Sequence, residues 1–470
     1  MMIRHRLLAG LALLAVVVPV LLLARVLAPT VGRAPASLGV ASPVAVGTST
    51  PAVRLISTPI MRPAPPTPAP TVSLPTLPPL YYRIRNVVVA AALDGTNPVT
   101  VATLPTSIRV APSLMSDGRL LYPTGTGFAA VDRYGRNAGI RVPALAAGEA
   151  VWQVAPSPGG RQLAWQIFSP ATYAGGGANG AGYTANTGAG RVVVTGRFGE
   201  ASGTTVLTER GDSTIFGQTQ AVLGWRAASP YGSGDATLLL QDLYSASSVG
   251  DKLLIGAERG LIEFDPAIKD IVNDYLPPLQ RDVPARQAFA LSPDGAWTVF
   301  GADYAFPPSG ESALARTIGV LDLDTNHSVK IDDASTYPIQ GTATTRTTTR
   351  VHGHTTVKTT KAILPLYHYF SHHAAIAPDD GRLLYTALTI SYPPGATVPA
   401  LTRDAVAASL DGRTRTTIAT DAEGEGWLSP TVAVVKKADG LYGVDIISRA
   451  VTRLVASTST SLGFIGLRRN

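Results

Sequence analysis

Beyond the N-terminus, apolar residues recur in short runs separated by turn residues, and this pattern predicts a protein built of β-strands. Valine, threonine and tyrosine are frequent in these runs, which are bounded by glycine and proline. Such runs are typical of strands, because a helix needs an apolar period of 3.6 residues sustained over several turns. No stretch after the N-terminus sustains that period long enough for a sizeable helix. We therefore expect an all-β fold.

A turn motif with an Asp-Gly centre recurs between apolar runs. Its clear copies are "LMSDGRLLYP" (114–123), "APSPGGRQLAWQ" (155–166), "LSPDGAWTVFGAD" (291–303) and "APDDGRLLYTAL" (377–388), and degenerate copies lie at 228–242 and 428–440. Glycine accepts a positive φ and aspartate bonds its local backbone, so the motif predicts a tight turn between two strands. The shortest spacing, 42 residues from Gly118 to Gly160, suits one four-stranded propeller blade, and longer spacings indicate insertions.

A second hairpin follows the turn motif in most copies. These hairpins cover residues 128–142, 317–331, 405–419 and 440–454. Two hairpins together make one antiparallel four-stranded sheet, and six such sheets are recognisable as the blades of a β-propeller. Residues 86–104 form a hairpin with no inner hairpin before it. We expect it to pair with residues 461–467 and close the ring, either as a seventh blade or by completing the sixth.

The quoted copies at 291–303 and 377–388 resemble the repeat of TolB-like, WD-repeat-like β-propellers found outside the bacterial cytoplasm. The resemblance covers residues 81–470 and implies a rigid ring whose loops bind proteins, peptides or saccharides. Three departures are visible. Gly159 stands where the family has aspartate, Asp379-Asp380-Gly381 contains one residue more than usual, and the copy near Ser429 lacks Asp-Gly.

The N-terminus predicts a membrane segment at residues 1–28. Arg4, His5 and Arg6 precede the uncharged run Leu7–Ala24, whose 18 residues are enough to cross much of a bilayer core. A cleavable signal peptide usually has an apolar region of only about 7 to 15 residues. We therefore expect one transmembrane helix as an uncleaved anchor, with the rest of the chain outside the cytoplasm. The alternative is a cleaved signal peptide and a secreted protein.

Residues 29–80 contain thirteen prolines, and this composition predicts a disordered, proline-rich stalk ahead of the propeller domain at 81–470. The chain has no cysteine, which excludes disulfides and lipid attachment at a cysteine. Six arginines and no acidic residue precede residue 81, which leaves 33 basic and 32 acidic residues in the propeller domain. Six of the seven net positive charges therefore arise in the anchor and stalk, and the net charge gives no support for nucleic-acid binding.

Known catalytic motifs are missing. The chain has no Gly-x-Ser-x-Gly pentapeptide of the serine peptidases that contain a similar propeller, no P-loop and no dinucleotide fingerprint. Residues 172–190 are rich in glycine but lack the lysine and the strand-to-helix setting of a phosphate-binding loop. We interpret them as part of an insertion at about 169–190. The sequence thus favours a protein that is not an enzyme and has no cofactor.

Histidines supply the alternative to that interpretation. His372 and His373 lie on an innermost strand just before a turn motif, and alternation sends one of them toward the centre of the ring. Together with His368 they are candidate ligands for one divalent metal. The resemblance adds weight, because oligogalacturonate lyases are TolB-like propellers that hold a metal through histidines. The lyases draw those ligands from several blades, whereas the other inner strands here offer no histidine. The alternative function is a metal-dependent, lyase-like propeller that acts on saccharides.

The segment "TTRTTTRVHGHTTVKTTK" (344–361) predicts a polar hairpin inserted at about 341–361. Threonine and charge alternate on both sides of a centre at Val351–His354, and the segment contains no acidic residue. The hairpin is either solvated decoration or a contact for an acidic partner, an envelope protein or an acidic saccharide. The candidate contact residues are Arg346, Arg350, His352, His354, Lys358 and Lys361. The preferred function is therefore a membrane-anchored, non-catalytic binding or scaffolding module at the cell envelope.

Overall fold

A computed structural model describes most of the chain from residue 77 onward. The described residues are 77–105, 110–125, 127–168, 172–176, 182–186, 190–195, 203–209, 218–227, 229–233, 236–249, 252–256, 261–275, 286–303, 314–352, 354–393 and 398–468. The chain divides into two compact units, residues 1–71 and 72–470, and the fold described below belongs to the second.

The predicted anchor at residues 1–28 and most of the predicted stalk lie outside the described residues. Within the described ranges, no helix is long and apolar enough to span a membrane. The predicted stalk boundary at residue 80 falls inside the fold, because Leu80 already begins the first strand.

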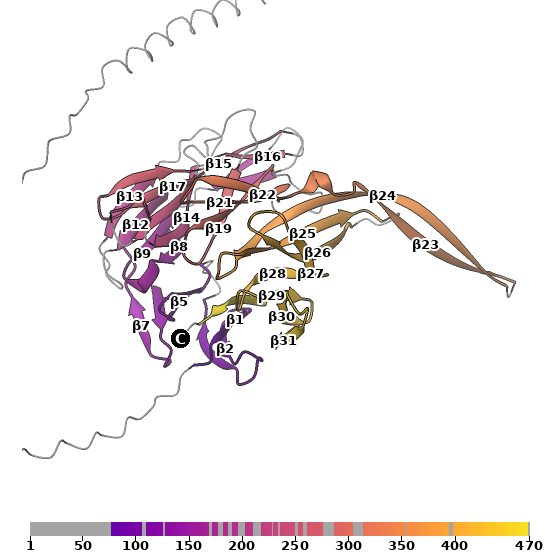
Figure 1. The fold of residues 1–470 in the computed structure, drawn as a ribbon, viewed down its shortest axis with the longest axis horizontal. Helices are drawn as coiled ribbons and strands as arrows, with labels where there is room; N and C mark the ends of the chain where they lie inside the picture. Colours follow the sequence, from indigo (N-terminus) through magenta and orange to yellow (C-terminus); the bar gives the residue numbers. More distant parts are fainter. Residues whose placement is uncertain are drawn as a thin grey trace, which may run out of the picture. The chain divides into compact units, whose positions relative to one another are not determined.

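Seven sheets of four or more antiparallel strands make up the fold, and Figure 1 shows their strands in sequence colours. From the innermost strand outward, the first four are β32 (Gly463–Leu467), β1 (Leu80–Ile84), β2 (Val87–Ala91), β3 (Val99–Thr103); β4 (Ser113–Leu114), β5 (Leu120–Thr124), β6 (Gly127–Val131), β7 (Asn137–Ile140); β8 (Ala150–Pro156), β9 (Leu163–Phe168), β12 (Gly190–Thr195), β13 (Gly203–Glu209); and β14 (Gln218–Ala227), β15 (Ala236–Val249), β17 (Leu261–Asp265), β18 (Asp270–Asp274).

The remaining three sheets are, in the same order, β19 (Arg286–Leu291), β20 (Trp297–Ala302), β21 (Thr317–Asp322), β22 (His327–Asp333); β24 (His354–Ile376), β25 (Arg382–Ser391), β26 (Ala400–Ser409), β27 (Arg415–Ala419); and β28 (Glu423–Trp427), β29 (Val432–Lys437), β30 (Gly440–Asp445), β31 (Val451–Ala456). Additional elements are β10 (Thr172–Gly176) paired with β11 (Gly182–Asn186), β16 (Lys252–Gly256) on β15, β23 (Gln340–Val351) on β24, and the short 3-10 helices Pro158–Gly160 and Ala334–Thr336.

Seven apolar clusters join each sheet to the next and show that the sheets form a closed ring. Each cluster combines residues of two neighbouring sheets, for example Phe128 with Trp165, or Leu239 with Phe300. The seventh cluster packs Leu441 of the last sheet against Leu80 of the first. The middle strands supply both faces, because alternate residues such as Val434 and Val435 enter different clusters. The protein is therefore an all-β, seven-bladed propeller.

The C-terminal strand closes the ring, as predicted. It does not pair directly with the predicted hairpin, because β1 lies between them. β32 is the innermost strand of the first blade, and it pairs with β1 rather than with the hairpin at 86–104. β1 forms an inner hairpin with β32 ahead of residues 86–104, where the sequence analysis expects no inner hairpin. The alternative in which β32 completes a sixth blade is excluded.

The turn motif forms the innermost hairpin of its blade in each described copy. Gly118, Gly160 and Gly295 adopt φ values of 82°, 66° and 81°, in the left-handed region that favours glycine. Asp380 takes the corresponding position at φ 52°, with its amide bonded to Ala377 as the amide of Gly295 is to Ser292. The departure at 379–381 is thus an aspartate in the place of the turn glycine, rather than an extra residue.

Candidate functional site

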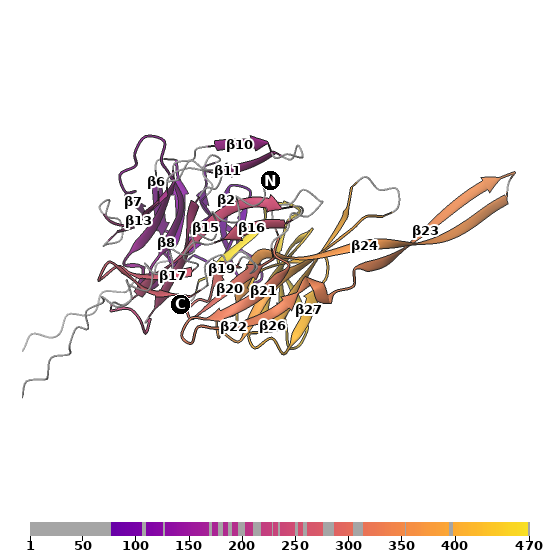
Figure 2. The same ribbon diagram turned by 90° about the horizontal axis from the view of Figure 1, so that it is seen from above.

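A long hairpin of β23 and the outer half of β24 is the main feature added to the ring. Twelve residue pairs hold it in register, from Gln340 opposite Pro365 to Val351 opposite His354. At about 3.3 Å per residue the hairpin is about 40 Å long. Figure 1 shows it extending beyond the other strands of its sheet, and Figure 2 shows its twist from above. The hairpin predicted around Val351–His354 is therefore present.

The hairpin is basic and exposed to solvent. The residues 348–350, His352, 354–359 and Lys361 are all exposed. No acidic residue occurs between Asp333 and Asp379, so nothing within this stretch of the sequence offsets the positive charge. The side chain of Arg346 lies outside the described part of the structure.

Cross-strand register divides the basic positions unequally between the two faces of the hairpin. Positions 344, 346, 348 and 350 lie opposite 361, 359, 357 and 355, and paired positions share a face. Arg350, Lys361 and the backbone position of Arg346 therefore belong to one face. Lys358 and His354 belong to the other.

The base of the hairpin is fixed by His368, one of the three predicted metal ligands. Its Nε2 lies 2.9 Å from the carbonyl oxygen of Pro338, and its Nδ1 lies 3.1 Å from the hydroxyl of Thr389. A carbonyl oxygen can only accept, so Nε2 donates and the lone pair of Nδ1 accepts from Thr389. The ring also stacks on Tyr337 at 4.9 Å. Both nitrogens are engaged in protein contacts, so His368 does not fit a metal site in this arrangement.

The other two predicted ligands lie in a β-bulge. Phe370 pairs with Ala387 and Ala374 with Tyr385, so three residues, 371–373, face the single residue Thr386. The bulge breaks the alternation from which the orientation of His372 and His373 was predicted. His373 is exposed, and the side chain of His372 lies outside the described part of the structure. Across the described ranges, no three histidine or acidic side chains are grouped to hold a metal.

A buried carboxylate ties the sixth blade to the fifth next to the hairpin base. Asp332 accepts hydrogen bonds from the hydroxyls of Tyr337 and Tyr385 at 2.8 and 2.6 Å. It also pairs with the guanidinium of Arg415, while its own side chain is fully buried. Burial and the Asp332 charge raise the pKa of both tyrosines, so they stay protonated and remain donors. These bonds fix the strands from which the hairpin emerges.

Sequence reasoning missed a pocket between the sixth and seventh blades. The pocket has a volume of about 610 Å³, and residues of β26 and β28 contribute to its lining. Its lining residues are Leu401, Arg403, Asp421, Ala422, Glu423, Lys436, Lys437, Ala438, Thr458, Ser459 and Thr460. They come from two blades and the loop before β32, so no local spacing in the sequence indicates the pocket.

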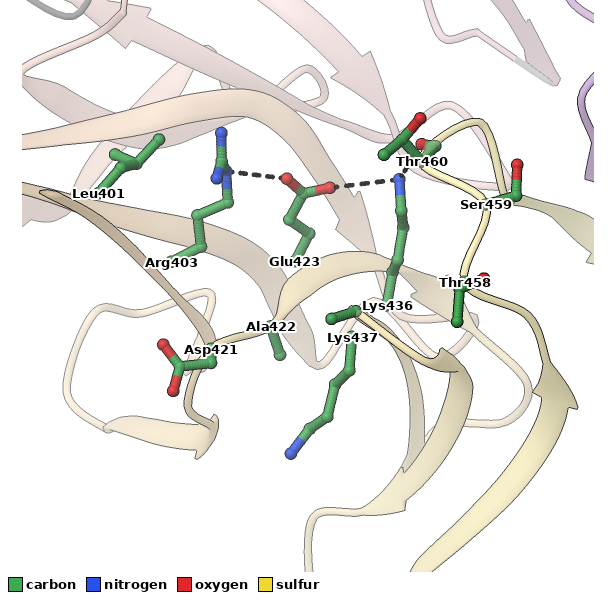
Figure 3. Close-up of a pocket in the computed structure, with 11 residues that line it drawn as sticks. Leu401, Arg403, Asp421, Ala422, Glu423, Lys436, Lys437, Thr458, Ser459 and Thr460 are labelled. Atoms are coloured by element: carbon green, nitrogen blue, oxygen red, sulfur yellow. Dashed lines mark hydrogen bonds and ion pairs between the residues drawn. The ribbon is translucent and has the colours of Figure 1, made fainter. Parts of the chain in front are cut away.

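Charged side chains line one wall of this pocket, as Figure 3 shows. Glu423 lies between two cations: its carboxylate is 2.9 Å from Nε of Arg403 and 3.7 Å from Nζ of Lys436. Lys436 also donates to the carbonyl oxygen of Thr460 at 3.0 Å. Including Lys437 and Asp421, the lining has three cations and two carboxylates. The charge balance suits a small anionic group, although Glu423 already neutralises much of it.

Glu425 is a second acidic residue on β28, where it forms a bulge. Its Oε2 accepts the backbone N–H of Phe464 at 3.1 Å, which links β28 to the closing strand β32. Burial raises the pKa of the Glu425 carboxyl, and the nearby Lys436 and His373 oppose that rise. The hydrogen bond to the closing strand indicates a structural role.

No family model matches the sequence, and no curated protein matches it significantly. Solved structures with a similar fold include an oligogalacturonate lyase in complex with manganese, at 10% identity and a TM-score of 0.43, covering 81% of this chain and 86% of that one. A putative TolB from Agrobacterium tumefaciens is 11% identical with a TM-score of 0.32, covering 72% and 90%. An oligogalacturonate lyase from Vibrio parahaemolyticus is 10% identical with a TM-score of 0.31, covering 72% and 92%. The neighbours thus include the TolB-like propellers that the sequence resembles, and the likeness concerns the fold alone.

Proposed function

We propose that this protein is a non-catalytic binding or scaffolding module that stands outside the cytoplasm and contacts an acidic partner, protein or saccharide, through the hairpin of β23 and β24. One observation carries the proposal. A hairpin about 40 Å long, exposed and without an acidic residue, rises from a base fixed by buried hydrogen bonds. Such a charged projection contributes little to the core of the ring, so an external contact best explains why it is present.

The location outside the cytoplasm is part of the proposal. Residues 1–28 would anchor the chain in the membrane, and the proline-rich residues up to the start of β1 would act as a spacer. The absence of cysteine means that the propeller does not depend on an oxidising compartment for its stability.

The metal-dependent alternative has weaker support. It requires His368, whose two nitrogens already bind Pro338 and Thr389, and the described residues contain no group of three candidate ligands. Elemental analysis of the full chain, purified without a histidine tag and without chelators, tests it directly. We expect no stoichiometric metal. About one metal per chain, lost in the double variant His372→Ala, His373→Ala, would revive the saccharide-active alternative.

The hairpin proposal is tested by replacing residues 344–361 with Asn-Gly. Ala343 and Ala362 then bracket a two-residue turn, as Val351 and His354 do in the native hairpin. Intact cells that express the full chain or this variant are treated with a cross-linker, and the partners of each are compared. We expect a defined partner of the full chain to be lost in the variant.

A matched control separates charge from length. The double variant Arg350→Gln, Lys361→Gln keeps the length of the hairpin and removes two cations from one face. It should retain only part of the cross-linking, and its difference from the full chain should shrink at higher ionic strength, because salt screens the cations that the full chain keeps. Identical partners for the full chain and the Asn-Gly variant would refute the hairpin as the contact surface.

A further inference from the structure

β23 is an edge strand, and its outer edge offers main-chain hydrogen-bonding groups to solvent. The sheet order places β23 at one end, next to β24, and no other described strand pairs with it. Its twelve residues therefore leave a row of N–H and C=O groups along the outer edge.

The register identifies which amides point outward. Val351 and His354 bracket a connection of two residues, and the pair that brackets such a turn exchanges both of its hydrogen bonds across the ladder. Hydrogen-bonded pairs alternate along antiparallel strands, so Thr349 and Thr347 also direct their amides inward. Thr344, Thr348 and Arg350 direct theirs outward.

The composition of the hairpin suits the addition of another strand. Threonine and valine favour extended backbone, and two strands alone form a marginal sheet, whereas a third strand adds ladder bonds and cross-strand contacts. The base is already ordered, because the backbone N–H of Leu366 bonds to the carbonyl of Ile339 at 2.9 Å next to the His368 contacts. A partner strand would therefore meet an edge whose direction is set in advance.

The positive charge of the hairpin determines which kind of strand can pair with the outer edge of β23. Like charges directly opposite each other destabilise a ladder, so Arg350 on β23 opposes pairing between two copies of this hairpin. Glutamate or aspartate on an added strand, opposite Arg350, would stabilise the ladder. Arg350 lies on β23 itself and has an outward amide, so one added strand can form both the main-chain hydrogen bonds and the ion pair.

We propose that the outer edge of β23 binds an extended acidic segment of a partner protein by strand addition, with a carboxylate placed opposite Arg350. This proposal rests on the proposed function and narrows the partner to a protein. A saccharide would contact the cations without needing the main-chain amides. A change that blocks only an outward amide therefore distinguishes the two kinds of partner.

The test measures binding of a fluorescent ten-residue peptide of alternating glutamate and threonine to the full chain by anisotropy. Thr348→Pro removes an outward amide and leaves the bonds between β23 and β24 intact, as proline at an edge position does. Thr348→Ala is the matched control, since it removes the same side chain and keeps the amide. We expect binding to weaken about tenfold or more in the proline variant and to be unchanged in the alanine variant.

Two further measurements test independently whether the peptide pairs with the main chain of β23. Thr344→Pro blocks a second outward amide and should weaken the peptide in the same way, even if Thr348→Pro disturbs the tip of the hairpin. Hydrogen exchange on the full chain should slow at the outward amides of Thr344 and Thr348 when the peptide is bound. Circular dichroism and thermal unfolding of each variant check that the ring is unchanged.

Several outcomes would overturn strand addition. Equal peptide affinity in the proline and alanine variants, with loss only in Arg350→Gln, Lys361→Gln, would leave a purely ionic contact. Binding of polygalacturonate but not of the peptide would assign the surface to a saccharide. If neither probe binds, yet replacing residues 344–361 still removes a cross-linked partner, strand addition falls and the proposed function stands.

Discussion

At the scale of single residues, Asp380 has the clearest effect on the fold. It occupies the turn position at which Gly118, Gly160 and Gly295 stand in other blades, so a side chain lies where those turns have none. That side chain meets Asp294 in the turn of the preceding blade. Burial and the charge of Asp294 raise the pKa of Asp380 to about 7. Asp294 has a lowered pKa and stays ionised.

The raised pKa of Asp380 predicts a pH-dependent stability. The folded state holds this proton up to about pH 7, whereas the unfolded chain releases it near its ordinary value of 3.8. The contribution of Asp380 to stability should therefore be greatest at low pH and fall as pH rises from about 4 to 7. In Asp380→Gly the residue at φ 52° loses its Cβ and its charge, so we expect a melting temperature a few degrees higher at pH 8.

Thermal unfolding of the full chain and of Asp380→Gly at pH 5 and pH 8 measures how the stability effect of Asp380 depends on pH. The gain from Asp380→Gly should be larger at pH 8 than at pH 5. Asp380→Asn is the control that removes the charge and keeps the side chain, and it should recover the pH-dependent part alone. Equal gains at both pH values would contradict the assigned carboxyl pair.

The buried carboxylate of Asp332 gives a second prediction at this scale. Asp332→Ala leaves the hydroxyls of Tyr337 and Tyr385 without their acceptor, and we expect a loss on the order of 3 kcal/mol in the free energy of unfolding. Denaturant unfolding measures that loss. Arg415→Gln should cost less, because the Arg415 side chain is about half exposed and its pairing with Asp332 is screened by solvent. A smaller loss in Asp332→Ala than in Arg415→Gln would contradict this order.

At the scale of elements, the sequence predicts strands and turns well and misses features that depend on contacts between blades. The hairpins at 317–331 and 440–454 are present because alternation and turn residues act within a few positions. β1 was missed because "LYYRI" directly follows the proline-rich segment and pairs with residues at the other end of the chain. The bulge at 371–373 and the hydrogen bonds of His368 depend on partners in β25 and before β23, so local spacing in the sequence does not indicate them. The metal site itself stays a prediction.

The hairpin of β23 and β24 should be nearly independent of ring stability. Beyond Leu364 its described side chains toward the tip are exposed except where the strands join the ring, and none of the described side chains at 344–361 belongs to an apolar cluster. The Asn-Gly variant lacking residues 344–361 should unfold within about 0.5 kcal/mol of the full chain. Denaturant unfolding of both proteins checks this value. A loss of several kcal/mol would mean that the hairpin supports the ring, which would weaken the argument that it exists for binding.

At the scale of the whole molecule, stability depends on closing the ring. β32 completes the first blade, and Arg468 adds two hydrogen bonds to the start of the ring. Its backbone N–H donates to the carbonyl of Pro79 at 2.9 Å, and its guanidinium donates to the hydroxyl of Tyr81 at 3.2 Å. The cluster that joins the last blade to the first lies beside this closure. Loss of β32 therefore exposes the inner edge of β1 and the adjoining core together.

Truncation after Leu462 tests this dependence. We expect it to cost about 5 kcal/mol or more, a large part of the net stability of a domain, and to produce aggregated protein. Truncation after Arg468 keeps β32 and the bonds to Pro79 and Tyr81, so it should leave the melting temperature unchanged. Size-exclusion chromatography and thermal unfolding compare the three lengths. A monomeric, cooperatively unfolding chain without β32 would show that six complete blades are sufficient.

The position of β32 in the sequence also determines when, during synthesis, the ring can close. Ribosomes make β1 before and β32 after the strands of the other six blades, so the first blade waits for its innermost strand until those blades have been synthesised. If the N-terminus is held in the membrane, the growing chain reaches the far side with that blade unfinished. We therefore expect the chain to need protection by export chaperones until β32 has been synthesised, and a product that stops before β32 to be degraded.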